Sequence, residues 1–208
     1  MTLQIDEIRT PQVEVEPPRE YFSKMAISKE QKEERVEASE DIQNVLLFLF
    51  ALLLVEMQYG EDYELVYDTF LARYQNVISK YARMDDYIKT YIAERTREIF
   101  EVTKERMELG GWWTSVDRAT AISENDANSV LNYEDLQKAI DDGYTMKTWR
   151  GMMDSRERKS HKEVEGVTIP IREYFAVGNT VMMMPHDPEC GDAREIANCR
   201  CSLKFIKE

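Results

Sequence analysis

The hydrophobic positions divide the chain into long helical stretches followed by short extended ones. The first stretch contains the most apolar run of the chain, Val45–Val55. Ser28 precedes this stretch with a side chain suited to capping a helix, and Gly60 follows it as a helix stop. The pattern therefore predicts one helix that begins after Ser28 and continues through the apolar run to Gly60.

Apolar side chains at steps of three and four continue beyond this helix. They recur from Tyr63 to Tyr81, resume at Tyr87 and stop at Gly110-Gly111. Such spacing places the apolar residues on one helix face and does not fit the alternation of a strand. We predict helices over both parts of this stretch.

The remaining helical stretch runs from Ser115 to Asp142. Its pattern reads as two shorter helices with a break near Asn132, closed by Gly143. Residues 29–143 are thus expected to be helical throughout, as a bundle or a long antiparallel hairpin. Residues 1–28 contain three prolines and are predicted to form an extended arm.

After Gly143 the pattern changes to short β-branched or apolar runs separated by turn residues. The predicted strands cover 144–149, 167–171, 181–184 and 202–206. We expect residues 144–208 to form a small unit of three or four antiparallel strands around one short helix that starts near Asp154. The predicted fold class is α+β, with a mainly helical N-terminal region and a small C-terminal α+β domain.

Charge is distributed unevenly along this organisation. The 208 residues carry a formal net charge of −13, of which −14 belongs to residues 1–143 and +1 to residues 144–208. An acidic helical region argues against non-specific nucleic-acid binding by that region. This argument against nucleic-acid binding does not apply to Lys147–Lys162, which contains six basic and two acidic side chains.

Three features bear on the compartment. The N-terminus lacks the basic and apolar regions of a secretory signal, and the three cysteines all lie in the last 19 residues. An odd cysteine count without a signal favours a reducing environment, and metal or core roles before disulfides. The run Val45–Val55 would span roughly 16 Å as a helix, short of the ~30 Å bilayer core, so we predict a buried helix or an oligomer contact rather than a membrane span.

The most informative residues form a spaced series in the C-terminal region. Asp154 is suited to capping the short helix, and the pairs Asp154/Arg158 and Glu157/His161 are helical neighbours four positions apart. The series comprises Trp149, Asp154, Arg156, Arg158, Ser160, His161, Gly166, Phe175, Pro185, His186, Asp187, Asn198, Cys199, Arg200 and Cys201.

This series resembles the phage head morphogenesis family, the minor head proteins similar to protein F of phage Mu. The similarity covers roughly residues 112–208, including the stretch Arg118–Asn128 before the domain. The resemblance implies a minor head protein of a tailed phage or prophage, found in the virion head and, during assembly, in the host cytoplasm. It implies partners such as the portal protein, the major capsid protein or scaffold, with contact to packaged DNA as a further option, and it implies no catalytic activity.

Two chemical interpretations of the series remain open beside a purely structural one. Thiolate and imidazole ligands suit Zn²⁺, and His161, Cys190, Cys199 and Cys201 are the candidate set. The structural alternative has a hydrogen-bonded His161 and cysteines packed as small apolar groups. Asp154, His161 and Asp187 form the candidate centre of a metal-dependent hydrolase or nuclease, which is the runner-up function.

The basic side chains near the series also have two interpretations. Arg150, Arg156, Arg158 and Lys159 are candidate contacts for phosphates or for an acidic partner. Alternatively they pair internally with Asp154, Glu157, Glu163 and Glu165, which we favour for Arg156 and Arg158. No membrane contact is expected, and residues 45–55 are the candidate homo-oligomer surface.

Overall fold

The computed structural model describes residues 21–60 and 62–207. Four long helices dominate it: α1 (Lys29–Tyr59), α2 (Tyr63–Ile78), α3 (Asp86–Arg106) and α4 (Val116–Asp141). Two short 3-10 helices, η1 (Met107–Leu109) and η2 (Gly111–Thr114), connect α3 to α4. The predicted arm lies mostly outside the described residues; residues 21–28 form turns whose Phe22 and Met25 side chains are buried.

The C-terminal region begins after α4 and is built from short elements. These are β1 (Met146–Arg150), α5 (Lys159–Val164), β2 (Thr168–Pro170), β3 (Phe175–Val177), β4 (Thr180–Met182), η3 (Pro188–Cys190), α6 (Ala193–Ile196) and β5 (Ser202–Ile206). One antiparallel sheet has the order β2-β1-β5, and β3 and β4 form a separate antiparallel pair. The α+β fold class is therefore confirmed.

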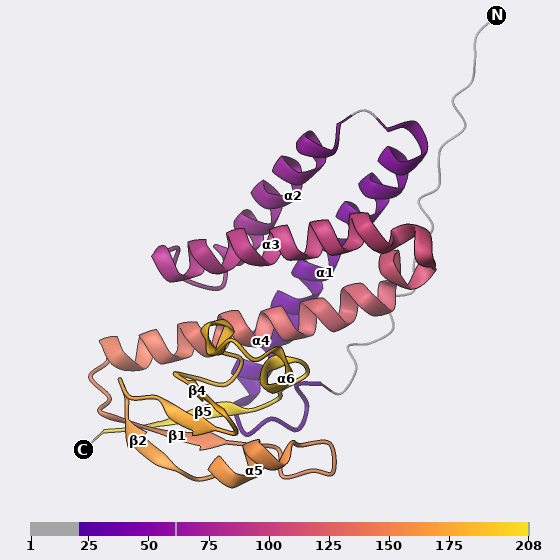
Figure 1. Cartoon of the computed structure of the whole chain (residues 1–208). Helices are drawn as coiled ribbons and strands as arrows, with labels where there is room; N and C mark the ends of the chain where they lie inside the picture. The colour runs from indigo at the N-terminus through magenta and orange to yellow at the C-terminus, as the bar shows by residue number, and fades with distance from the viewer. Residues whose placement is uncertain (1–20, 61, 208) are drawn as a thin grey trace, which may run out of the picture.

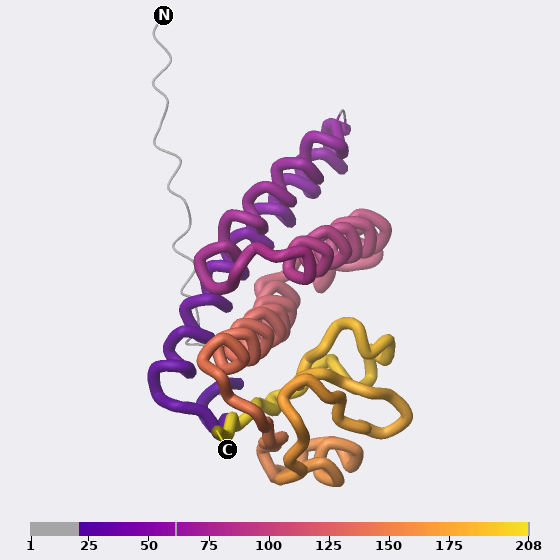
Figure 2. Tube along the Cα trace, turned by 90° about the vertical axis from the view of Figure 1, so that its left-hand side faces the viewer, coloured from indigo at the N-terminus to yellow at the C-terminus, as the bar shows by residue number. Residues whose placement is uncertain are grey.

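α4 lies between the other long helices and the C-terminal region (Figures 1 and 2). It packs along α1, and β5 approaches it from the other side. α1 and α2 form an antiparallel hairpin that extends away from the C-terminal region, at the top of Figure 1. One buried apolar cluster runs from Phe22 through α4 to Leu203, so the helical region and the C-terminal region share a core. The division of the chain into an arm, a helical region and a small domain therefore stays a prediction.

The first helix follows the sequence prediction closely. Ser28 is its N-cap: the Ser28 hydroxyl accepts from the Gln31 N–H, and the Gln31 side chain accepts from the Ser28 N–H. Gly60, with φ of 24°, ends the helix. From the run 45–55, Val45, Leu46, Leu49, Phe50 and Leu53 are buried within the chain.

α1 is also the helix, among the residues described, that is long and apolar enough to cross a membrane. An 18-residue window in it has a mean hydropathy of 1.7, so the apolar part of this helix is longer than the eleven-residue run Val45–Val55. Half of that window is buried inside the protein, and α1 packs on α2 and α4. This packing is that of a core helix.

Three local predictions were wrong. α4 is continuous through Asn132, because the polar side chains that suggested a break face the C-terminal region and hydrogen-bond to it. The short helix α5 begins at Lys159 and has Arg158 as its N-cap, so Asp154 does not cap it. Strand β3, which contains Phe175, was not predicted, because three residues are too few for alternation to show.

Candidate functional site: a buried histidine and two cysteines

The centre of the C-terminal region is a buried cluster of His161, Cys199 and Cys201. His161 lies on α5, and both cysteines lie on the segment that leads into β5. The His161 Nδ1 atom is 3.5 Å from the Cys199 Sγ and 3.4 Å from the Cys201 Sγ. All three side chains are at most 2% exposed. The structure thus brings together three of the four predicted metal ligands.

Cys190 is the predicted ligand that does not join this cluster. It ends η3, and its sulfur atom contacts the backbone of Asp192 at 3.4 Å and 3.6 Å. Within residues 21–60 and 62–207, the group close enough to hold a metal ion consists of His161, Cys199 and Cys201. Of the four candidate ligands, Cys190 thus lies outside this group, and metal binding itself stays a prediction.

Aromatic side chains enclose the cluster. Trp149 on β1 is fully buried, and its ring meets the His161 ring edge-on with centroids 5.5 Å apart. Phe175 packs on the same indole at 5.3 Å. The turn at Gly166, whose φ is +74°, returns the chain so that its N–H donates to the Trp149 carbonyl. Trp149 and Phe175 thus form an aromatic layer beside the His161 ring.

The three groups perturb one another electrostatically. Burial raises the pKa of Cys199, but hydrogen bonds with Cys201 and His161 outweigh it and bring that pKa well below its ordinary value. The Cys201 pKa is raised by the hydrogen bond to Cys199 and by burial. Burial opposes protonation of His161, yet its contact with Cys199 raises the pKa overall. These shifts favour a negative Cys199 sulfur beside a positively charged His161.

Asp154 and Arg200 form an ion pair between the loop before α5 and the segment that carries both cysteines. The two Arg200 terminal nitrogens lie 3.1 Å and 2.8 Å from the two Asp154 oxygens. Asp154 also accepts from the Arg156 N–H, and the Arg200 pair lowers the Asp154 pKa. These contacts tie residues 154–156 to the segment that carries both cysteines.

His186 and Asp187 belong to a different turn. His186 is buried, has φ of 64° and contacts the Cys199 carbonyl through Nε2, and burial lowers its pKa. Asp187 accepts from the Met183 and Glu189 backbones and from the Tyr87 hydroxyl. Asp154, His161 and Asp187 each have separate partners, and among the described residues they do not form one metal-binding group. This geometry disfavours the hydrolase interpretation.

The basic side chains proposed as partner contacts lie at the surface beside acceptors. Arg150 is 3.3 Å from Glu165, Arg156 is 4.0 Å from Asp154, and Lys159 is 3.6 Å from Glu163. Arg158 instead donates to the Ala197 carbonyl. The predicted four-apart pairs Asp154/Arg158 and Glu157/His161 do not form, because α5 begins only at Lys159.

The sequence reasoning missed the residues that hold the cysteine segment from outside. Asn128 of α4 donates to the Cys199 carbonyl, and Asn132 donates to the carbonyls of Pro185 and Cys201. Arg35 of α1 donates to both asparagine side chains and to Asp135. The Tyr21 hydroxyl donates to the Cys199 carbonyl at 2.7 Å. A pair of asparagines four apart in a predicted helix was the available signal.

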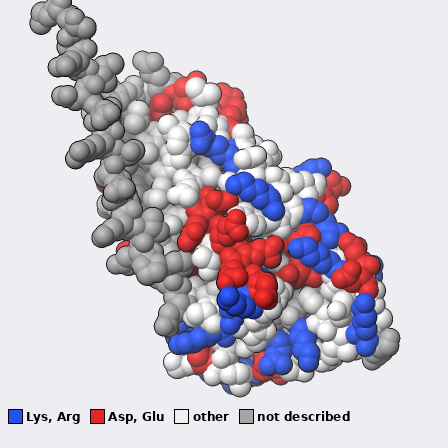
Figure 3. Space-filling view, turned by 180° about the vertical axis from the view of Figure 1, so that it is seen from behind, with Lys and Arg blue, Asp and Glu red and all other residues white. Residues whose placement is uncertain are grey.

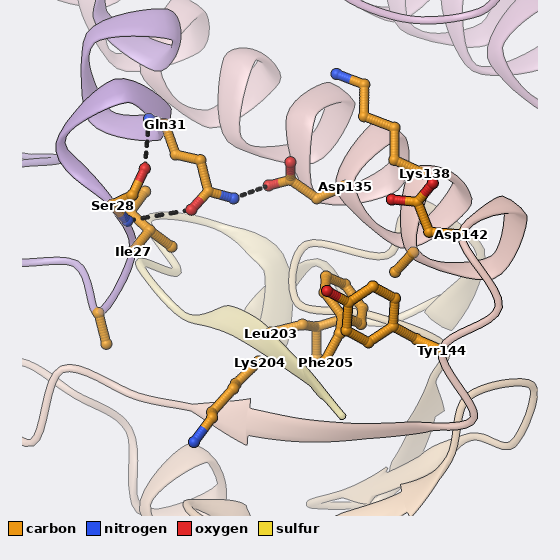
Figure 4. Close-up of a pocket in the computed structure, with 12 residues that line it drawn as sticks. Ile27, Ser28, Gln31, Asp135, Lys138, Asp142, Tyr144, Leu203, Lys204 and Phe205 are labelled. Atoms are coloured by element: carbon orange, nitrogen blue, oxygen red, sulfur yellow. Dashed lines mark hydrogen bonds between the residues drawn. The ribbon is translucent and has the colours of Figure 1, made fainter. Parts of the chain in front are cut away.

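Two hollows flank this region without containing the cluster. One, of about 400 Å³, lies between residues 26–31, the end of α4 and β5 (Figure 4). There the Gln31 side chain accepts from the Ser28 N–H and donates to Asp135. These polar groups of the hollow are therefore hydrogen-bonded to one another. The other, of about 550 Å³, lies between α3, α4 and residues 186–198. It is lined by the Arg95–Asp126 ion pair, whose atoms are 2.9 Å apart.

The fold and this cluster define a small α+β module, closed around one histidine and two cysteines and carried on a long helix. The chain belongs to the family of phage Mu protein F like proteins, whose profile matches residues 68–204. The match confirms the resemblance seen in the C-terminal residues and extends it to α2 and α3. No curated protein and no solved structure matches the chain.

Family membership gives the coarse function. The family is one of structural proteins of phage head morphogenesis, so the chain acts in the head or its assembly. Membership of this family also implies that the chain interacts with other head proteins in general.

Proposed function

We propose that the protein is a minor head protein that contacts the portal or neighbouring capsid subunits during head assembly. The family match over residues 68–204 supports the assembly role. The proposed contact surface, called here the hairpin tip, is the exposed apolar end of the α1–α2 hairpin: Leu54, Val55, Met57, Tyr59 and Leu65.

The hairpin tip brings five exposed apolar side chains to one end of a charged protein. Figure 3 shows acidic side chains gathered across the rear face with basic ones interspersed around them. Leu65 is 62% exposed and Tyr59 is 70% exposed, in a protein whose formal net charge is −13. Clustered apolar side chains on a charged surface mark protein contacts.

The charge pattern favours a protein partner over DNA. Arg150, Arg156 and Lys159 each lie beside a carboxylate. A phosphate would have to compete with these carboxylates and approach an acidic molecule. We therefore assign the contact to a head protein, with DNA binding as the alternative outcome.

The test combines location and contact. Mass spectrometry of purified heads should find the chain, and immobilised portal protein should capture it. Leu65→Gln should weaken capture at least tenfold, whereas Val181→Gln, an exposed apolar residue of β4, should leave capture unchanged. Absence from heads together with no capture by portal or capsid protein would overturn the proposal, and retention on DNA instead would assign the contact to nucleic acid.

A further inference from the structure

The His161, Cys199 and Cys201 cluster has the spacing of a metal site. With Zn–S bonds of about 2.3 Å and Zn–N or Zn–O bonds of about 2.0–2.1 Å, tetrahedral geometry sets sulfur–nitrogen and sulfur–oxygen separations near 3.5 Å. The two sulfur–nitrogen distances here are 3.4 Å and 3.5 Å. These two distances already match a shared ion.

A carboxylate lies beside one of the two sulfur atoms, outside the group of three mutually close ligand atoms. The Glu157 Oε1 atom is 3.6 Å from the Cys201 Sγ. The same carboxylate accepts from the backbone N–H groups of Met152 and Met153, which fixes its place. A Cβ atom at Gly151 would lie 1.8 Å from Glu157 Oε1, so glycine leaves the room that this carboxylate occupies. To serve as a fourth ligand, this carboxylate would have to leave the Met152 and Met153 N–H groups and turn toward His161.

The outer partner of the histidine is that of a metal ligand. With Nδ1 facing the sulfurs, His161 Nε2 lies 3.1 Å from the Glu195 carboxylate, close enough to pair with it although the angle does not make a hydrogen bond, and the Ser160 hydroxyl donates to that carboxylate. A ligating histidine commonly offers its second nitrogen to a carboxylate, which orients the ring and strengthens the ligand. Gly178 leaves room for Glu195, since a Cβ atom there would lie 2.9 Å from its Oε1.

We propose that His161 Nδ1, Cys199, Cys201 and Glu157 bind one structural Zn²⁺ ion, with Glu195 orienting His161. The ion would join α5 and the loop before it to the segment entering β5, and its charge of +2 would offset the two thiolates. A module of about 65 residues has a marginal core, so a bound metal ion would stabilise its fold. This inference goes beyond the proposed contact with head proteins and does not depend on it.

The first measurement uses the full chain without variants. Protein purified without chelators, exposed to excess Zn²⁺ and desalted should carry one zinc per chain by elemental analysis. Replacement with Co²⁺ should give a sulfur-to-cobalt charge-transfer band and the strong visible bands of tetrahedral cobalt. A folded chain, by circular dichroism, that carries less than a tenth of an equivalent of zinc and shows no such bands would overturn the proposal.

Variants then assign the ligands. Cys199→Ser and Cys201→Ser should lose the charge-transfer band, whereas Cys190→Ser is the matched control and should keep one metal per chain. Glu195→Gln touches no metal ion and should fold, yet bind Zn²⁺ about 10–100-fold more weakly. Loss of metal from Cys190→Ser, or unchanged affinity in Glu195→Gln, would contradict the assignment.

Discussion

The long helices are stabilised mainly by apolar packing, whereas the C-terminal module also depends on buried hydrogen bonds. α1 and α2 bury continuous apolar faces, for example Leu46, Leu49 and Phe70. The module instead keeps its cysteine segment in place through buried polar contacts with α4, including those of Asn128 and Asn132. Local sequence patterns therefore determine the helices, whereas the module's loops depend on partners distant in sequence.

Arg35 is where the two regions meet, and its loss should have the largest effect. The guanidinium is fully buried and donates to Asn128, Asn132 and Asp135. Arg35→Ala removes the donor to both asparagine oxygens and leaves Asp135 only the Gln31 side chain, and breaking a buried charged network costs about 3–5 kcal/mol. Urea denaturation should show this loss, and Lys29→Ala, which removes an exposed pair with Glu33, should change the midpoint little. Equal midpoints for both variants would show that the regions are not coupled through Arg35.

Within the helical region, the effect should follow apolar burial alone. Leu46 is fully buried on α1, whereas Leu54 on the same helix is 40% exposed. Leu46→Ala should lower the free energy of unfolding by about 2–5 kcal/mol because it opens a cavity. Leu54→Ala is the matched control, and we expect its loss to be well below half as large by the same urea titration. Similar losses for the two would mean that the hairpin tip is covered by another chain.

Lys147 should make the stability of the C-terminal module depend on pH above about 8. Its side chain is fully buried, and Nζ donates to the Met183 carbonyl at 2.6 Å. Burial lowers its pKa to about 8, although Asp187 and Glu173 oppose the shift. Between pH 8 and about 10.4, the usual lysine value, the unfolded chain therefore binds more protons than the folded one, and the free energy of unfolding rises with pH.

The measurement compares wild type with Lys147→Met across that window. The stability difference between them should shift in favour of the wild type by about 1–3 kcal/mol as the pH rises from 8 to 10.4. Below pH 8 the difference should be constant, because both states of the wild type hold the proton. A difference that does not change with pH would contradict a lowered pKa at Lys147.

What the sequence could predict follows the same division. The bounds of α1 were readable from Ser28, the apolar run and Gly60, since capping and periodicity are local. Asn132 suggested a helix break because asparagine is a poor helix former, yet its side chain is satisfied by carbonyls more than fifty residues away. For the site, residue type pointed to His161, Cys199 and Cys201, whereas the roles of Glu157, Gly151 and Arg35 needed the tertiary structure.

The smallest effect is expected at Arg156, and it separates the module's surface from its interior. The Arg156 side chain is 68% exposed and only 4.0 Å from Asp154, so Arg156→Ala should change the unfolding free energy by no more than about 0.5 kcal/mol. Arg200 pairs with the same carboxylate but is 7% exposed at its side chain, so Arg200→Ala should cost about 1–3 kcal/mol in the same titration. If Arg156→Ala leaves stability unchanged but reduces capture by a head protein, this arginine is a partner contact rather than an internal pair. Unchanged capture would leave the hairpin tip as the surface through which the protein meets its partner.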